Sequence, residues 1–170
     1  MARAIKTAAI TIERIFDAGR REVWRAWSDA QWLKQWWGPK DFTAPTIKLD
    51  FHLGGKYLFC MRSPEKKDYW STGKYTAIVI PKLISCTDSF ADEHGSAVGA
   101  SYYGMSEDFP LETQITAAFE EIEDKTRLIL RHEGIPAGQI LQECTLGWNQ
   151  SLDKLQLLLK HEHFEILVKS

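Results

Sequence analysis

The stretch QILQECTLGWNQSLDKLQLLLK, residues 139–160, decides the fold. At 100° per residue its apolar positions fall within about 80° of one another, which is the pattern of an amphipathic helix. These positions are Leu141, Cys144, Trp148, Leu152, Leu155 and Leu159. Such a helix is about 33 Å long, roughly the width of a small domain. Its apolar stripe needs a large apolar surface to pack against, and we expect the rest of the chain to supply it.

Alternation of apolar and polar residues predicts strands in the remainder of the chain. The predicted strands are 8–16, 46–51, 56–61, 70–80, 83–90, 111–121 and 126–132. Two short helices, 20–27 and 28–37, are predicted after the first strand, and the second begins in a capping box that spans Ser28 and Gln31. Short connections favour antiparallel pairing. We therefore predict an α+β helix-grip fold, in which a curved antiparallel sheet of about seven strands wraps around the long C-terminal helix.

Length and composition predict a single domain over residues 1–170, with a core over about 8–160. The net charge is -2 and the two signs are interspersed, so we expect neither a nucleic acid nor a membrane surface as partner. Cys60, Cys86 and Cys144 are far apart and odd in number, which favours reduced thiols. There is no run of about 18 apolar residues and no signal-peptide pattern at residues 1–7. We expect a cytoplasmic protein.

Residues 91–110 break the alternation and contain Gly95, Gly99 and Gly104. Long loops are often functional, and we interpret this one as a lid over a cavity between helix and sheet. Strand and helix periodicity then selects the inward-facing residues. The predicted ligand-binding residues are Tyr57, Phe59, Met61, Tyr75, Phe119, Leu128, His132, Leu141, Cys144, Trp148 and Leu152.

The inward polar residues Tyr57, Tyr75, Thr113 and His132 either orient a ligand or are satisfied by partners within the protein. The tryptophans leave similar alternatives. Trp32, Trp36 and Trp37 form either a cavity rim or plain core, and we favour core packing; a tryptophan-rich surface is also compatible with a homodimer. Trp148 either fills the cavity or lines one wall.

No motif for nucleophilic catalysis or phosphate binding is present in the sequence. The acids at 120–124 cluster at a hairpin and are interpreted as a solvated turn. His161 and His163 lie two residues apart, so they would diverge on a helix, and we interpret this segment as a frayed polar tail. We expect no metal and no cofactor.

Several short motifs resemble a known family. In chain order they are Trp32 with Trp36-Trp37-Gly38-Pro39, Asp50 with Gly54-Gly55, Gly73-Lys74-Tyr75, Thr126-Arg127-Leu128 with His132-Glu133-Gly134, and Gly147-Trp148 ahead of Leu152 and Leu155. Together they cover about residues 8–160. The set resembles the START-like superfamily, also called SRPBCC or Bet v-like, and within it the family of the activator of heat shock protein 90 ATPase homologue.

This resemblance implies a helix-grip fold whose cavity holds apolar molecules such as lipids, sterols or polyketides, and it does not imply a shared reaction. Two features depart from the family. His52 stands where the family commonly has arginine, and the loop 91–110 is longer than expected.

Three hypotheses follow. The first is a non-enzymatic protein that binds a small hydrophobic molecule. The second, suggested by the family name alone, is a co-chaperone that regulates the ATPase of heat shock protein 90. The third is a cyclase- or hydrolase-type enzyme that acts on an apolar substrate in the same cavity, with His132 or a tyrosine as acid or base.

Overall fold

The computed structural model describes residues 5–169, apart from the side chains of residues 163, 164, 166 and 167. The strands are β1 (Thr7–Phe16), β2 (Thr43–Leu49), β3 (Lys56–Arg62), β4 (Asp68–Val79), β5 (Leu83–Ala91), β6 (Thr113–Ile122) and β7 (Lys125–Pro136). The helices are α1 (Arg20–Ser28), α2 (Ala30–Trp36), the 3-10 turn η1 (Ala100–Tyr103) and α3 (Gln139–Lys169). The strands form one seven-stranded antiparallel sheet in the order β1-β7-β6-β5-β4-β3-β2.

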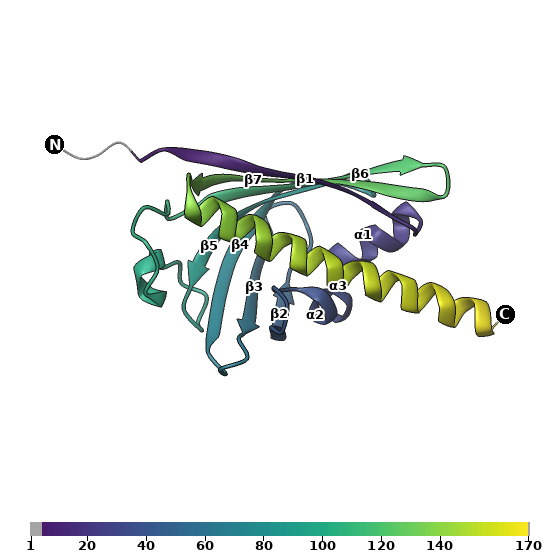
Figure 1. Ribbon diagram of the computed structural model, residues 1–170, viewed down its shortest axis with the longest axis horizontal. Helices are drawn as coiled ribbons and strands as arrows, with labels where there is room; N and C mark the ends of the chain where they lie inside the picture. Colours follow the sequence, from purple (N-terminus) through teal and green to yellow (C-terminus); the bar gives the residue numbers. More distant parts are fainter. Residues whose placement is uncertain (1–4, 170) are drawn as a thin grey trace.

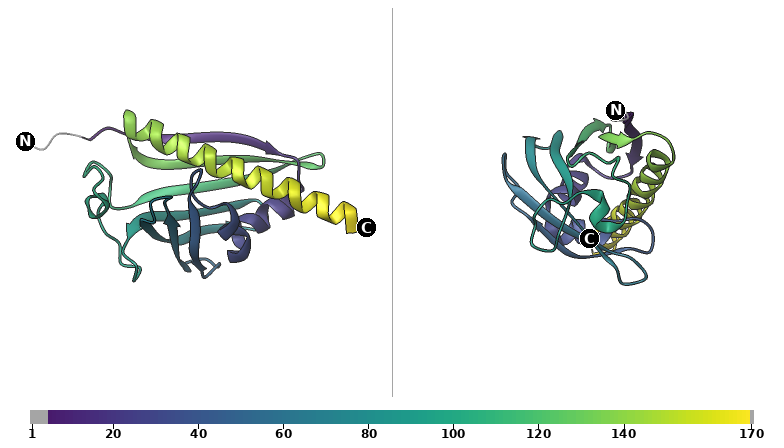
Figure 2. Two further views of the ribbon diagram at one scale, coloured as in Figure 1. Left: turned by 60° about the horizontal axis from the view of Figure 1, so that its bottom comes forward. Right: turned by 90° about the vertical axis from the view of Figure 1, so that its left-hand side faces the viewer.

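The sheet bends so strongly that β1, β7 and β6 form one wall and the remaining strands form another (Figure 1). Helix α3 runs obliquely across the open side between these walls, and the end-on view in Figure 2 shows it closing the curl of the sheet. Helices α1 and α2 cover the end nearer the C-terminus of α3. The predicted α+β helix-grip fold is confirmed.

The apolar stripe of α3 changes character along its length. Leu152, Leu155 and Leu159 are fully buried, whereas Cys144 and Trp148 are only half-buried. Burial of leucine side chains is worth about 1.5–3 kcal/mol each, so the second part of the stripe anchors the helix on the sheet. The first part has less to pack against, because a cavity lies beside it.

Beyond residue 160 the helix continues to Lys169, so the predicted frayed tail is wrong. Extension of an existing helix needs no new nucleation, so these residues can continue the anchored turns. His161 Nε2 lies 3.3 Å from an oxygen of Glu165 one turn later. The side chain of His163 lies outside the described residues.

The N-terminus of α2 is capped one residue later than predicted. Asp29, not Ser28, accepts hydrogen bonds from the backbone N–H groups of Gln31 and Trp32, at 2.9 and 3.4 Å. Ser28 is instead the last residue of α1, and its hydroxyl donates to the carbonyl of Trp24. The two helices are so close together that the aspartate takes the capping position.

We expect Asp29→Ala to lower the free energy of unfolding by about 1 kcal/mol, because the first N–H groups of α2 lose their acceptor. Asp29→Ser is the matched control, since a serine at this position also caps. Urea denaturation of both variants measures the difference. Equal losses for alanine and serine would contradict the capping role.

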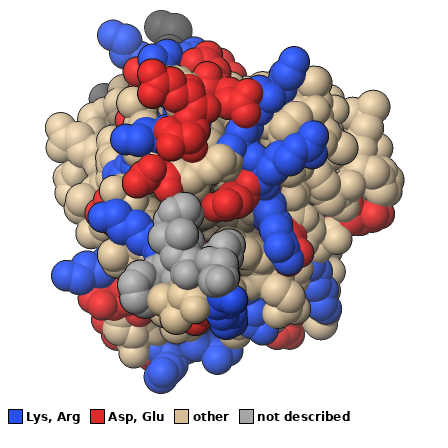
Figure 3. All heavy atoms as spheres, turned by 90° about the vertical axis from the view of Figure 1, so that its right-hand side faces the viewer, with Lys and Arg blue, Asp and Glu red and all other residues tan. Residues whose placement is uncertain are grey.

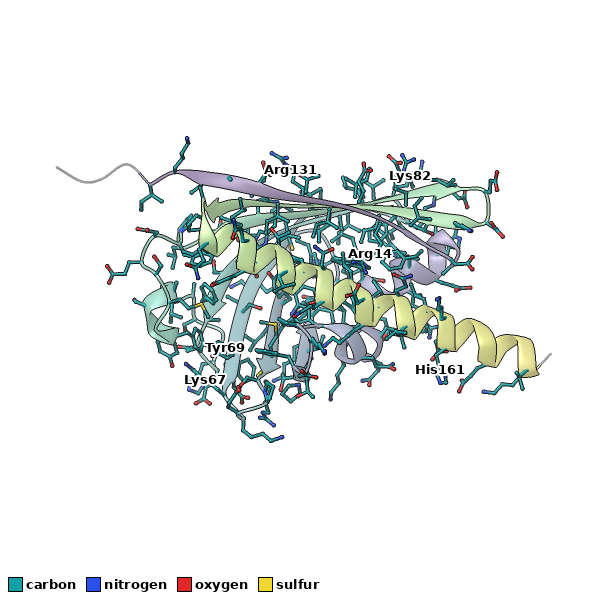
Figure 4. The ribbon with its side chains drawn as sticks, viewed as in Figure 1. Arg14, Lys67, Tyr69, Lys82, Arg131 and His161 are labelled. Atoms are coloured by element: carbon teal, nitrogen blue, oxygen red, sulfur yellow. The ribbon has the colours of Figure 1, made fainter. Side chains whose placement is uncertain are left out.

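Polar contacts hold α3 from two sides. Arg14 on β1 points toward α3 (Figure 4), and its Nη1 lies 2.6 Å from Asp153 Oδ1. Lys154 Nζ donates to the carbonyls of Pro39 and Phe42, both at 3.2 Å. Burial lowers the pKa of this ammonium. These contacts fix the helix relative to β1 and to the loop after α2.

The face beyond the C-terminal end of α3 carries both signs of charge. Acidic side chains gather near its upper edge and are flanked on both sides by basic ones (Figure 3). Within residues 5–169, no helix is both long enough and apolar enough to span a bilayer.

Candidate ligand cavity

A cavity of about 480 Å³ lies between the first turns of α3 and the bent sheet. Helix α3 contributes the wall from Ile140 to Ser151, and the sheet contributes side chains from β3 to β7. The segment after α2 closes one side with Trp37, Gly38 and Pro39. Most of the lining is aromatic or aliphatic. A size of about 300–1,000 Å³ is usual for small-molecule sites.

The loop 91–110 supplies Met105, Ser106, Phe109 and Pro110 to the cavity lining. It is folded and attached to the sheet: the hydroxyl of Tyr103 donates to the carbonyl of Ala91 and accepts from the backbone N–H of Trp70 at 3.0 Å. The loop therefore forms part of the cavity wall, at the place where the sequence suggested a lid.

Of the residues predicted to bind ligand, Met61, His132, Cys144 and Trp148 line this cavity. The others lie outside its lining. Tyr57, Phe59, Tyr75, Phe119, Leu128 and Leu152 are buried in the core, and Leu141 is half-buried against it.

An aromatic partition separates these two groups. The ring of Trp148 stacks on Trp27 at 6.2 Å and meets Trp37 edge-on at 5.5 Å. Trp37 in turn contacts Phe59, with ring centroids 5.1 Å apart. The partition leaves solid core toward the C-terminus of α3 and the cavity toward its N-terminus. Trp148 thus forms a cavity wall and fills the space behind it.

The polar end of the cavity begins at His132. Trp148 Nε1 donates to His132 Nδ1 at 3.1 Å, and His132 Nε2 lies 2.8 Å from Thr113 Oγ1. The hydroxyl of Thr113 is 3.2 Å from the carbonyl of Asp88, to which it donates. This chain requires the neutral tautomer of His132 with its hydrogen on Nε2. Burial lowers the pKa of His132 to about 4, which is consistent with the neutral ring.

Asp88 on β5 is the residue that the sequence analysis missed. Its Oδ1 accepts a hydrogen bond from the Tyr57 hydroxyl at 2.7 Å, and its Oδ2 is 3.9 Å from His132 Nε2. Burial raises the pKa of Asp88 to about 6, although the bond from Tyr57 acts in the opposite direction. The sequence did carry a signal for this residue. Asp88 lies two residues from both Cys86 and Phe90, on the same face of β5, so an acidic residue interrupts an apolar face.

The seven-stranded curl, the gripped helix and the cavity between them define a START-like, or SRPBCC, domain. The chain belongs to the family described as Activator of Hsp90 ATPase homolog 1-like protein, whose sequence profile matches residues 17–160. The resemblance read from the short motifs is thereby confirmed.

Solved structures agree with this assignment. The AHSA1 protein of Silicibacter pomeroyi is 26% identical, with a TM-score of 0.76 over 92% of this chain and 100% of that chain. A protein of Chromobacterium violaceum is also 26% identical, with a TM-score of 0.74 over 89% of this chain and 96% of that chain. No curated protein matches the chain significantly.

Proposed function

We propose that this protein binds a small, mostly apolar molecule in the cavity beside the first turns of α3. The observation that carries the proposal is a cavity of about 480 Å³ that is lined by mainly apolar side chains. Water in a pocket with such walls finds few hydrogen-bond partners, so an apolar guest that displaces it is favoured.

The composition of the walls supports the same proposal. Met61 and Met105 face the cavity from β3 and from the loop 91–110, and methionine side chains adapt to guests of different shape. The indole rings of Trp37 and Trp148 offer flat apolar surfaces. A guest that displaces solvent from these surfaces gains free energy in proportion to the apolar area covered.

We expect the wild-type protein to bind 2-methylnaphthalene, measured by isothermal titration calorimetry. Cys144→Phe should weaken binding by about tenfold or more, because the added ring takes up cavity volume. Leu157→Phe is the matched control: it adds an aromatic ring to the same helix, but Leu157 is 68% exposed and lies outside the cavity lining.

Absence of any heat of binding to the wild type would overturn the proposal. So would equal weakening by both phenylalanine variants. Native mass spectrometry of the purified protein gives an independent readout, since a guest retained from the expression host adds a defined mass that Cys144→Phe should lose.

The two alternative hypotheses stay predictions. Stimulation of the ATPase of a heat shock protein 90 by this chain would support the co-chaperone. For the enzyme, both ring nitrogens of His132 already have partners, in Trp148 and Thr113, which favours a positioning role over proton transfer.

A further inference from the structure

The charges around the cavity are of one sign. Asp88 and Glu143 contribute carboxyl groups to the lining, and within the described part of the chain no lysine or arginine lines it. Lys67 approaches from outside, with its ammonium 5.0 Å from the Tyr69 ring, but it is exposed and not part of the lining. A carboxylate guest would therefore enter a site that offers it repulsion and no counter-charge.

Asp88 and Glu143 differ in position. Glu143 is exposed at the mouth, where its Oε1 accepts a hydrogen bond from Gln139 at 2.9 Å. The Asp88 side chain is 23% exposed and belongs to the polar inner end formed with Thr113 and His132. Only Asp88 is placed to meet the polar end of a guest whose apolar body occupies the cavity.

One carboxylate oxygen of Asp88 can still accept a hydrogen bond. Oδ1 accepts from Tyr57, whereas Oδ2 receives no hydrogen bond from any residue in the described ranges. His132 does not donate to it, because the hydrogen on Nε2 is directed to Thr113 and the distance to Oδ2 is 3.9 Å. The Asp88 side chain is 23% exposed and lines the cavity, so solvent can reach it there, and the donor group of a guest can take the place of that solvent.

We infer that the guest of this cavity carries a hydrogen-bond donor, a hydroxyl or an ammonium, that meets Asp88 Oδ2, and that the cavity rejects carboxylates such as free fatty acids. This inference rests on the proposed function and specifies its ligand class. A hydrogen bond to a charged oxygen is about twice as strong as one between neutral groups, so the donor is a main source of selectivity.

Of the titratable groups in this cluster, Asp88 is the one whose charge changes near pH 6. Tyr57, Cys86, His132 and Cys144 face it from β3, β5, β7 and α3. Burial raises the pKa of the tyrosine and of both thiols, so these groups stay protonated and neutral, and His132 is neutral as well. Affinity for a donor should therefore fall below pH 6, as Asp88 takes up a proton, and affinity for a carboxylate should rise.

Four probes that share one ring system test the inference by calorimetry at pH 7.5: 2-methylnaphthalene, 2-naphthol, 2-(aminomethyl)naphthalene and 2-naphthoic acid. The hydroxyl and ammonium probes should each bind at least about tenfold tighter than the acid. The tighter of the two donors identifies the head group that the site prefers. Asp88→Asn should abolish the preference over the acid, and Asp88→Leu should make 2-naphthol and 2-methylnaphthalene bind equally.

Asp108→Asn is the matched control, because it removes a carboxylate from an exposed position of the loop 91–110 outside the cavity lining. It should leave the ranking of the probes unchanged. If 2-methylnaphthalene binds but the acid binds as tightly as 2-naphthol, or if Asp88→Asn keeps the wild-type ranking, this inference is wrong and the proposed function stands. If none of the four probes binds, both are wrong.

Discussion

Replacement of Asp88 by asparagine is expected to stabilise the protein by about 3 kcal/mol above pH 6 and to have no effect near pH 4. Burial raises the pKa of this carboxyl from 3.8 to about 6 in the folded chain. Between these values the folded state holds a proton that the unfolded state has lost, so the wild type loses stability as the pH rises through this window. Asparagine does not titrate and avoids the loss.

His132 makes the opposite contribution. Its pKa falls from 6.5 to about 4 on folding, so its stabilising effect is present above pH 6.5 and is lost on acidification to pH 4. In the wild type, between pH 4 and 6, the folded pair of Asp88 and His132 holds one proton, and so does the unfolded pair. The effects of the two groups on the pH dependence of stability therefore cancel.

In the Asp88→Asn variant only His132 of this pair titrates, so the free energy of unfolding should rise by about 3 kcal/mol from pH 4 to 6.5. In the His132→Gln variant only Asp88 of this pair titrates, so the free energy of unfolding should fall over the same pH range. Urea denaturation at half-unit pH steps measures both, with Asp108→Asn as the control. Parallel curves for Asp88→Asn and the wild type would show that the carboxyl is not desolvated.

The other large effect on stability is expected when Trp36 is replaced. This side chain is fully buried, packs on Trp27 at 4.9 Å and donates from Nε1 to the carbonyl of Ala26 at 2.9 Å. Trp36→Ala should lower the free energy of unfolding by about 3–5 kcal/mol, because it creates a cavity and also leaves the carbonyl of Ala26 without that donor.

Trp32→Ala is the matched control on the same helix. Trp32 is half-buried and rests against the Arg25 guanidinium at 5.2 Å, so its removal should have a clearly smaller effect. Denaturation midpoints compare the two variants. A larger loss at Trp32 than at Trp36 would mean that α2 packs through its other face.

The fold was predictable because its signals are periodic. The stripe from Leu141 to Leu159 and the strand alternation of β3 to β7 repeat over many residues, so one irregular position does not hide the pattern. Predictions at single positions were less reliable. Ser28 and Asp29 are both good capping residues, so the pattern alone did not choose between them, and the structure has the cap at Asp29. The predicted frayed tail after residue 160 was also wrong, because α3 continues to Lys169.

The cavity was harder to locate than the fold. Periodicity identifies the inward face of each element but not whether the space beyond that face is filled. Tyr57, Phe59 and Met61 share one face of β3, yet only Met61 reaches the cavity, because Trp37 packs against Phe59. Asp88 was missed since a charged residue in a strand is usually solvated.

The uneven burial of α3 bears on how the fold can diversify. The buried leucines Leu152, Leu155 and Leu159 must stay apolar, because they anchor the helix on the sheet. In the turns before them, Ile140, Cys144 and Gly147 line the cavity, so substitutions there would change the shape of the cavity while leaving the buried leucines in place. Relatives with little sequence in common could thus differ in the size and lining of this cavity while they keep the same fold.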